Sequence, residues 1–302
     1  MSATSVAVRR TRASWLARAA DYVELSKPRI GLSVVITVAV AYRGACGGQP
    51  GLLMMVHVLL GTLLVACSAS SVNQWLERDR DALMARTSSR PLPAGRLSVA
   101  EAIRFAALAG ILGTFYLLLT MGWQTATWAA LTWLLYAAVY TPLKTRTSFN
   151  TAVGAVAGAM PVLIGWSAAG RSYDLRSASL FLMLFFWQFP HFVAISWIYR
   201  DQYATAGMRM LPVVDPTGRR AGRCAVVAAM AIIPISIVPA AFLPGAGGAL
   251  YAMTAVSLGF AQLGCALFFS LRRDDVAARR LLHASLVHLP TLLFLLLLLP
   301  WS

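Results

Sequence analysis

About nine apolar runs, each roughly 18 residues or longer, follow one another along the chain. A run of this length is enough for a helix to cross a bilayer, and only helices or closed barrels satisfy their backbone hydrogen bonds there. The runs lie at about 28–46, 52–76, 99–120, 123–142, 150–169, 178–199, 222–243, 247–270 and 281–300. With 59% hydrophobic residues and 12% charged residues, the chain is not an ordinary soluble globule. We therefore predict an all-α, polytopic membrane protein.

The net charge of +15 is distributed unevenly between the two sides of this arrangement. Only Arg43, Arg171 and Arg176 fall on one side, and all other lysines and arginines fall on the other. This follows the positive-inside rule, so the charge marks orientation and does not indicate nucleic-acid binding. We expect a multi-pass protein of the cell inner membrane, with Ser302 on the side opposite the cytoplasm. The segments predicted to be cytoplasmic are the N-terminus and loops 77–98, 143–149, 200–223 and 271–280.

The chain is expected to form a single domain over residues 1–302, in which 1–26 is a basic cytoplasmic segment. The first apolar run is too long for a signal peptide and is followed by further runs, so no cleavage is expected. The four cysteines are far apart and form no C-x-x-C pair, which predicts neither a zinc site, covalent haem nor a disulfide framework. They are Cys46, Cys67, Cys224 and Cys265.

The second apolar run ends in a group of acidic and amide side chains, called the acidic face here. Asn73, Glu77 and Asp81 recur every four residues, so on a helix they share one side. Carboxylate and amide oxygens suit Mg²⁺, which usually joins one or two carboxylates to substrate phosphates. A solvated helix end is one alternative, and Na⁺ or proton coupling in a transporter is another, because ionisable residues at membrane depth mark functional sites in general.

Two arginines follow this face. Pro91 and Pro93 end the helix, which leaves Arg86 and Arg90 in the connecting segment. The guanidinium fork suits phosphate oxygens, so both arginines are candidate diphosphate ligands. Anchoring of the loop at lipid head groups is the alternative.

Several motifs occur in order along residues 24 to 220. They are Asn73-Gln74-Trp75 to Glu77 and Asp81, Met84-Ala85-Arg86-Thr87, Arg90-Pro91-Leu92-Pro93, Tyr140-Thr141-Pro142-Leu143-Lys144, Asn150-Thr151, Gly154-Ala155, Gly158-Ala159, Pro161, Gly165-Trp166, and Trp187-Gln188-Phe189-Pro190-His191-Phe192. Together they resemble the UbiA superfamily of intramembrane prenyltransferases, and within it the haem-farnesylating branch.

The resemblance implies a UbiA-type helical bundle and a farnesyl transfer. Farnesyl diphosphate would ionise with the help of Mg²⁺, a vinyl group of protohaem IX would attack the allylic carbon, and water would complete the product, haem O. Haem is then a substrate rather than a prosthetic group. A haem A synthase or oxidase-assembly protein is a possible downstream partner, although no surface motif identifies one.

The resemblance also assigns roles by position. Asn73, Glu77 and Asp81 correspond to the first metal–diphosphate motif, and Lys144 joins them as a catalytic and diphosphate-contacting residue. Topology marking alone is the alternative for Lys144. Asp201 is a tentative metal ligand, but Gln202 stands where the family usually has an acid. The same aspartate would otherwise pair with Arg200 or Arg209.

His191 and Trp187 lie one turn apart in an apolar run. Neutral imidazole commonly ligates haem iron, so both are tentative haem contacts. A hydrogen-bonded core histidine is the alternative. Gly154, Gly158 and Gly165 are expected to serve helix packing.

Two other functions are open at this stage. The first is prenyl transfer to a phenolic or quinone precursor, against which the Trp187-to-Phe192 motif argues. The second is an ion-coupled transporter, which Mg²⁺-dependent release of diphosphate would exclude.

Overall fold

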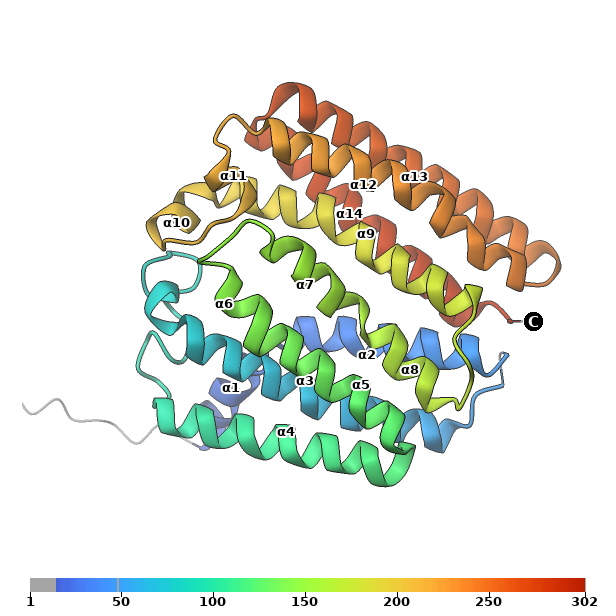
Figure 1. Cartoon of the computed structure of the whole chain (residues 1–302), viewed down its shortest axis with the longest axis horizontal. Helices are drawn as coiled ribbons and strands as arrows, with labels where there is room; N and C mark the ends of the chain where they lie inside the picture. Colours follow the sequence, from blue (N-terminus) through green and yellow to red (C-terminus); the bar gives the residue numbers. More distant parts are fainter. Residues whose placement is uncertain (1–14, 48, 302) are drawn as a thin grey trace, which may run out of the picture.

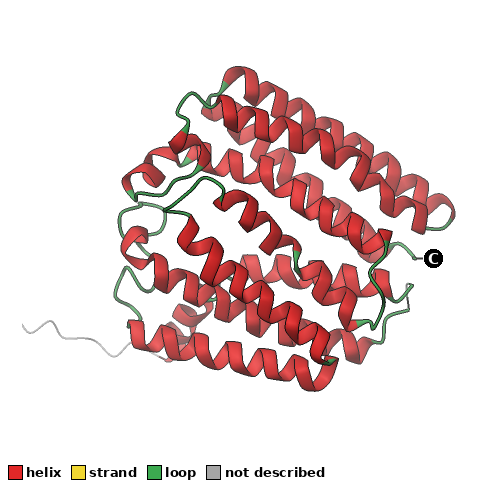
Figure 2. Ribbon diagram, in the orientation of Figure 1, coloured by secondary structure: helices red, strands yellow, loops and turns green. Residues whose placement is uncertain are grey.

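The computed structural model describes residues 15–47 and 49–301. Helices account for all of the regular structure in these two ranges, and no strand occurs in them (Figures 1 and 2). The all-α prediction is therefore confirmed. The helices in the first half of the chain are α1 (Trp15–Leu25), α2 (Pro28–Ala45), α3 (Leu52–Asp81), α4 (Val99–Met121), α5 (Trp123–Trp133), the π-helix η1 (Leu134–Tyr140) and α6 (Thr141–Leu143). Those in the second half are α7 (Asn150–Ala159), α8 (Pro161–Ala168), α9 (Leu175–Ile198), α10 (Arg200–Thr205), α11 (Leu211–Val214), α12 (Arg219–Ile237), the 3₁₀-helix η2 (Val238–Phe242), α13 (Gly245–Arg272) and α14 (Asp275–Leu298).

Seven helices in the described ranges are long and apolar enough to cross a membrane. They cover Leu52–Asp81, Val99–Met121, Asn150–Ala168, Leu175–Ile198, Arg219–Phe242, Gly245–Arg272 and Asp275–Leu298. Two of the predicted runs, 28–46 and 123–142, are absent from this set. The first forms the 18-residue α2, which carries Arg29 and Arg43 near its ends, and the second is divided among α5, η1 and α6. The sequence-based count of nine is therefore approximate, although both of these runs are helical.

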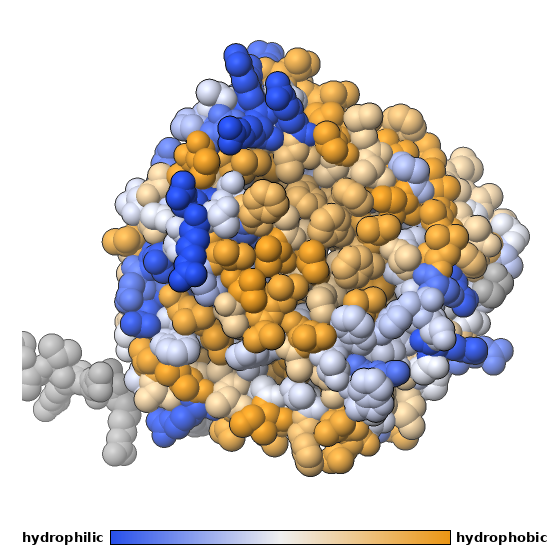
Figure 3. Space-filling model, viewed as in Figure 1, coloured by the Kyte–Doolittle hydropathy of each residue, from blue (hydrophilic) through white to orange (hydrophobic). Residues whose placement is uncertain are grey.

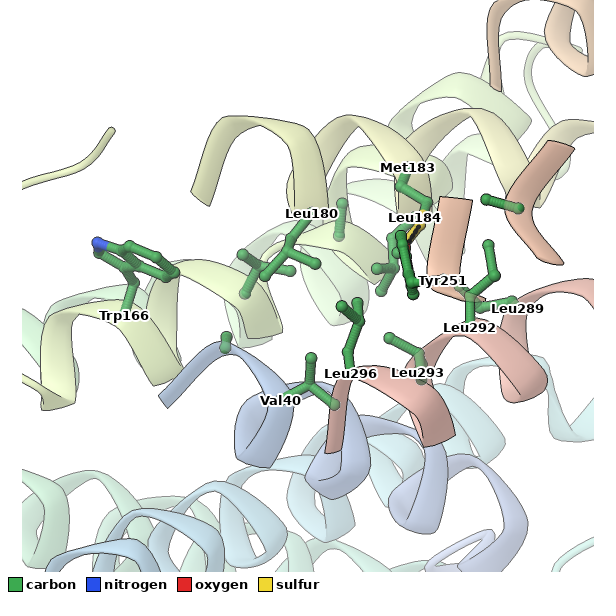
Figure 4. Close-up of a cluster of buried hydrophobic side chains, with 14 of the residues drawn as sticks. Val40, Trp166, Leu180, Met183, Leu184, Tyr251, Leu289, Leu292, Leu293 and Leu296 are labelled. Carbon is green, nitrogen blue, oxygen red and sulfur yellow. Dashed lines mark hydrogen bonds between the residues drawn. The ribbon is translucent and has the colours of Figure 1, made fainter. Parts of the chain in front are cut away.

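The core of the bundle lies where helices from both halves of the chain meet. Figure 4 shows side chains of α2, α8, α9, α13 and α14 pointing toward one another, among them Val40, Trp166, Met183, Tyr251 and Leu292. All five are 1% exposed or less. Lipid tails are as apolar as these side chains, so close packing rather than escape from water holds helices together in a bilayer.

The outside of the bundle is apolar. A broad hydrophobic area crosses the face drawn in Figure 3, with hydrophilic residues gathered toward its edges. Side chains such as Leu112, Leu119 and Phe260 are 58%, 70% and 59% exposed. A surface of this kind fits contact with lipid, and the chain is a multi-pass membrane protein.

Part of the predicted basic segment 1–26 lies outside the described residues. Its described portion holds α1, which is connected to the loop after α3 because Arg96 forms ion pairs with Asp21 and Glu24. The loop ends where Ser98 and Glu101 form a capping box at the start of α4. The segment between Asp81 and Ser98 is thus held at both ends.

The polar connections gather at one end of the bundle. In Figure 1, α6, α10 and α11 lie at the left, and α14 ends at the opposite side. The backbone N–H of Arg209 donates to the carbonyl of Lys144, which joins the segment after α10 directly to the segment after α6. Two connections that are distant in the sequence therefore meet at this end of the bundle.

Candidate active site

The acidic face predicted from the sequence lies at the end of α3. Asn73, Glu77 and Asp81 are 0%, 5% and 1% exposed, so this face points into the protein. The helix continues to Asp81, and turns follow it up to Pro91 and Pro93. Carboxylates buried in this way need cations or metal ions close by, because an isolated buried charge is very costly.

Each of the two carboxylates has a cation beside it. Lys144 Nζ lies 2.7 Å from Glu77 Oε1, and Arg90 donates to Asp81 Oδ2 at 2.7 Å. Burial by itself lowers the pKa of Lys144, but the Glu77 carboxylate, together with Tyr140 and Tyr136, outweighs burial and holds that pKa above its ordinary value. Lys144 therefore stays charged. The structure brings together four of the residues singled out in the sequence.

A further lysine, which the sequence analysis did not assign to the site, completes this group. The Lys27 ammonium contacts Asn73 Oδ1, and Asn73 Nδ2 donates to Thr141 Oγ1 at 2.9 Å. Burial lowers the pKa of Lys27 to about 7, and the positive charge of Arg90 adds to this effect. One feature of the sequence could have indicated Lys27 as a site residue. It lies directly before Pro28, where the first predicted span begins, so its charge is placed at the edge of the membrane.

The backbone of Lys27 is in the left-handed region, with φ at 51°. A lysine rarely adopts this conformation, which costs on the order of 1–3 kcal/mol. The surrounding contacts must therefore hold it, and strain of this kind is often found at functional positions.

Arg86 lies on the exposed side of the same region. Its guanidinium donates to the Tyr203 hydroxyl at 3.0 Å and sits 4.8 Å from the centroid of the Tyr199 ring. Its backbone N–H donates to Gln202 Oε1 at 3.2 Å. Gln202 thus joins the loop after α3 to α10.

Asp201 does not join the buried carboxylates of α3. Its side chain is exposed on α10, and Arg200 pairs with Asp275 rather than with Asp201. No group of three or more histidine, cysteine, aspartate or glutamate side chains in the described ranges is arranged to hold a metal ion.

His191 and Trp187 lie deeper, on α9. Their rings stack with centroids 4.7 Å apart and planes 20° apart. His191 Nδ1 lies 2.9 Å from Ser285 Oγ, and the Trp187 indole donates to the Ser285 carbonyl at 2.7 Å. The two aromatic rings form one unit anchored to α14.

Residues 34–298 match the UbiA prenyltransferase family. The chain belongs to this family. A protoheme IX farnesyltransferase of Solibacter usitatus is 41% identical over 287 residues, which cover 92% of this chain and 98% of that relative. Another, of Rhodopirellula baltica, is 40% identical over 277 residues, covering 90% and 96%.

Solved structures share the fold of this UbiA family member. A digeranylgeranylglyceryl phosphate synthase superposes with a TM-score of 0.76 at 16% identity, covering 93% of this chain and 98% of that one. A UbiA homologue from Archaeoglobus fulgidus bound to GPP and Mg²⁺ gives a TM-score of 0.69 at 15% identity, covering 91% and 99%.

The acidic face of this UbiA chain fits a magnesium ion shared with a diphosphate. Asp81 Oδ1 is buried and has no hydrogen-bond partner among the residues that the structure describes. An orphaned carboxylate oxygen of this kind suits a hard cation, and Mg²⁺ typically takes only one or two carboxylates when phosphates supply further oxygens. Glu77 and Asp81 are the two carboxylates that could hold such an ion.

Proposed function

We propose that this protein transfers a farnesyl group from farnesyl diphosphate to a vinyl group of protohaem IX, with addition of water, giving haem O and diphosphate. The relatives named protoheme IX farnesyltransferase support the substrates, at about 40% identity over most of the chain. The single structural observation that carries the proposal is the set of half-buried cations, Lys144, Arg90 and Lys27, around the buried Glu77 and Asp81.

The reaction breaks the allylic C–O bond, the vinyl π bond and one O–H bond of water, and it forms one C–C bond and one C–O bond. The allylic C–O bond of farnesyl diphosphate breaks, and diphosphate leaves with the bonding electron pair. The terminal vinyl carbon of the porphyrin then bonds to the allylic carbon, which leaves a cation on the carbon next to the ring. Water adds there and loses a proton, so the product carries a hydroxyethylfarnesyl group.

The side chains at the end of α3 would act on the leaving group. Glu77 and Asp81 would hold Mg²⁺, and Asn73, through its bonds to Lys27 and Thr141, would align the face on which they lie. When bound, the ion would neutralise charge that develops on the diphosphate. Support comes from the Archaeoglobus fulgidus homologue bound to GPP and Mg²⁺. Asp201 is in our proposal a peripheral, water-mediated ligand, in keeping with its exposure.

Cationic side chains would contact the diphosphate directly. Lys144 and Arg90 already lie within 2.7 Å of the carboxylates, and Arg86 reaches the same region from the exposed side. Guanidinium and ammonium groups in a site of low water content stabilise developing negative charge more strongly than they do in water. The three cations would therefore favour cleavage of the C–O bond.

The acceptor would lie deeper in the bundle, against Trp187 and His191. The His191 imidazole would offer an iron ligand to the porphyrin, and the Trp187 indole stacked on it would hold the imidazole in place. We also propose an inner-membrane location, with the loops after α3, α6 and α9 on the cytoplasmic side, where the diphosphate is soluble.

The proposal is tested with membranes that contain the protein, incubated with protohaem, farnesyl diphosphate and Mg²⁺. We expect chromatography and mass spectrometry to detect a hydroxyethylfarnesyl haem that EDTA abolishes. If protohaem stays unchanged although the protein is folded, the proposal fails in favour of another prenyl acceptor, such as a phenol or quinone precursor. Diphosphate release without any prenylated product would likewise contradict it.

A further inference from the structure

Two aromatic side chains of α9 converge on a single residue of α14. The Trp187 indole donates to the Ser285 carbonyl at 2.7 Å, while His191 Nδ1 lies 2.9 Å from the Ser285 hydroxyl oxygen. Ser285 is 0% exposed. It contacts both rings of the stacked pair, one through its backbone and the other through its side chain.

The hydrogen-bond network assigns the tautomer of His191. The Ser285 hydroxyl has one proton, and its oxygen lies 2.7 Å from the Leu282 carbonyl, to which it donates. The same oxygen must then accept the bond from His191, so the imidazole carries its proton on Nδ1. In the opposite arrangement the hydroxyl turns to His191, the bond to Leu282 is lost, and an Nε2–H is left without an acceptor among the described residues.

The assignment leaves His191 Nε2 with a free lone pair. This nitrogen makes no hydrogen bond with any residue that the structure describes, and the side chain is only half-buried. His288, one turn after Ser285 on α14, differs because both of its ring nitrogens are enclosed by the protein without a partner. Of these two intramembrane histidines, His191 is the one that a ligand can reach.

We propose that Ser285 is a positioning residue for the haem substrate: it fixes the His191 imidazole in the Nδ1–H tautomer and presents Nε2 to the haem iron. This rests on the proposed function, in which protohaem is the acceptor. Ser285 itself does not touch the substrate. A histidine ligand usually donates its second ring N–H to an oxygen acceptor, which sets the orientation of the ring and increases its basicity.

The depth of His191 agrees with this role. It precedes Tyr199 by eight residues on the same stretch of chain, a rise of about 12 Å along a helix. Tyr199 contacts Arg86 of the proposed diphosphate site. The iron ligand therefore lies toward the membrane interior relative to the diphosphate, where a large apolar acceptor is soluble.

The test is a titration of the purified protein in lipid nanodiscs with ferric protohaem, followed by the Soret band and by electron paramagnetic resonance. Ser285→Ala is expected to weaken haem binding about 10-fold or more and to change the axial-ligand signature, since loss of such a supporting contact costs about 10–100-fold in metal affinity. Ser285→Thr keeps the hydroxyl and should restore both. Ser236→Ala is the matched control, because Ser236 is 0% exposed and bonds in the same way to the carbonyl three residues before it, with no histidine partner.

A double-mutant cycle separates positioning from general damage. In a His191→Ala background, Ser285→Ala should have no further effect on haem affinity. The inference is overturned if Ser285→Ala keeps the wild-type affinity and spectrum, if it still weakens binding without His191, or if the wild-type protein does not bind haem. Haem binding is measured without farnesyl diphosphate, so it is independent of the transfer reaction. A protein that shows the Ser285-dependent signature but forms no haem O would disprove the proposed reaction. The inference about Ser285 would still stand in that case.

Discussion

At the scale of single residues, the site is a set of buried charges that balance one another locally. Glu77 is paired with Lys144 and Asp81 with Arg90, while Lys27 contacts the neighbouring Asn73. Removing one member of a buried pair leaves an uncompensated charge, which costs more than loss of an exposed pair. Substitutions at this site should therefore affect activity strongly, and exposed charges nearby provide controls.

Asp81→Asn keeps the shape of the side chain and removes its charge. We expect a folded protein whose farnesyl-transfer rate falls by roughly 100-fold or more, because a preorganised electrostatic contact to the leaving group is lost. The rate is measured as haem O formed at saturating Mg²⁺. Asp79→Asn is the control, since Asp79 is exposed and pairs only with Arg78 across 3.3 Å. Near-normal turnover of Asp81→Asn would remove Asp81 from the metal site.

Lys27→Met replaces the half-buried ammonium with an apolar side chain of similar length. We expect kcat/KM for farnesyl diphosphate to fall about 10-fold or more, since hydrogen bonds to charged groups contribute about 1.5–3 kcal/mol. Arg29→Met tests the neighbouring exposed charge and should change kcat/KM little. Equal effects of the two substitutions would show that Lys27 acts only through overall charge.

The sequence predicts some residues of this site and misses others for a physical reason. Four-residue spacing places Asn73, Glu77 and Asp81 on one face, because helix geometry is local. Lys27 reaches the site only through the path of α1 and α2 and a left-handed backbone that no pattern reveals. The link between Arg86 and Gln202 was equally hidden, since it joins residues 116 positions apart.

At the scale of helices, small residues decide how closely neighbours approach. A Cβ added to Gly165 of α8 would collide with the Val38 carbonyl oxygen and would lie 3.0 Å from the Tyr42 nitrogen, both in the backbone of α2. A backbone cannot rotate away as a side chain can. This close approach lets α2 and α8 pack beneath the core that also holds Trp166.

Gly165→Ala should lower the melting temperature in detergent, with a destabilisation of about 1–3 kcal/mol from overpacking. Gly264→Ala is the matched control, because Gly264 lies inside α13 and a Cβ there meets nothing within 4 Å. We expect the control to be neutral or slightly stabilising, as alanine favours helix over glycine. A Gly165→Ala protein as stable as the control would refute tight packing of α8 on α2.

Helix boundaries were the less predictable part of the fold. The length of the apolar runs predicted the long helices well. The run at 123–142, however, is divided by the π-helix Leu134–Tyr140, where the hydrogen-bond pattern changes without a change in composition. The short α10 and α11 lie within the predicted polar loop after α9. Helices of this length show too little periodicity to be recognised.

At the scale of the whole molecule, the positive charges and the polar loops distinguish the same two ends of the helical bundle. Most of the described lysines and arginines lie in or next to α1 and the connections that follow α3, α6, α9 and α13. Positive loops of this kind are typical of the cytoplasmic side. We therefore expect all of the site-forming loops to face one compartment.

Cysteine labelling in intact cells tests this orientation. In a protein whose Cys46, Cys67, Cys224 and Cys265 are replaced, Tyr173→Cys should react with a membrane-impermeant maleimide from outside the membrane. Ser148→Cys should react only after the cells are opened, because it lies in the predicted cytoplasmic loop 143–149. The reverse pattern would invert the orientation, and reaction of both positions from outside would contradict the topology.

The length of α3 leads us to expect that the substrate is supplied from the lipid leaflet. Its 30 residues make a helix about 45 Å long, whereas the hydrocarbon layer is roughly 30 Å thick, so its charged end extends to the level of the lipid phosphates. A farnesyl diphosphate lying in one leaflet would already hold its head group at that height. Turnover should then follow the surface density of farnesyl diphosphate in the leaflet, and adding inert lipid at a fixed total amount of substrate should slow the reaction by two-dimensional dilution.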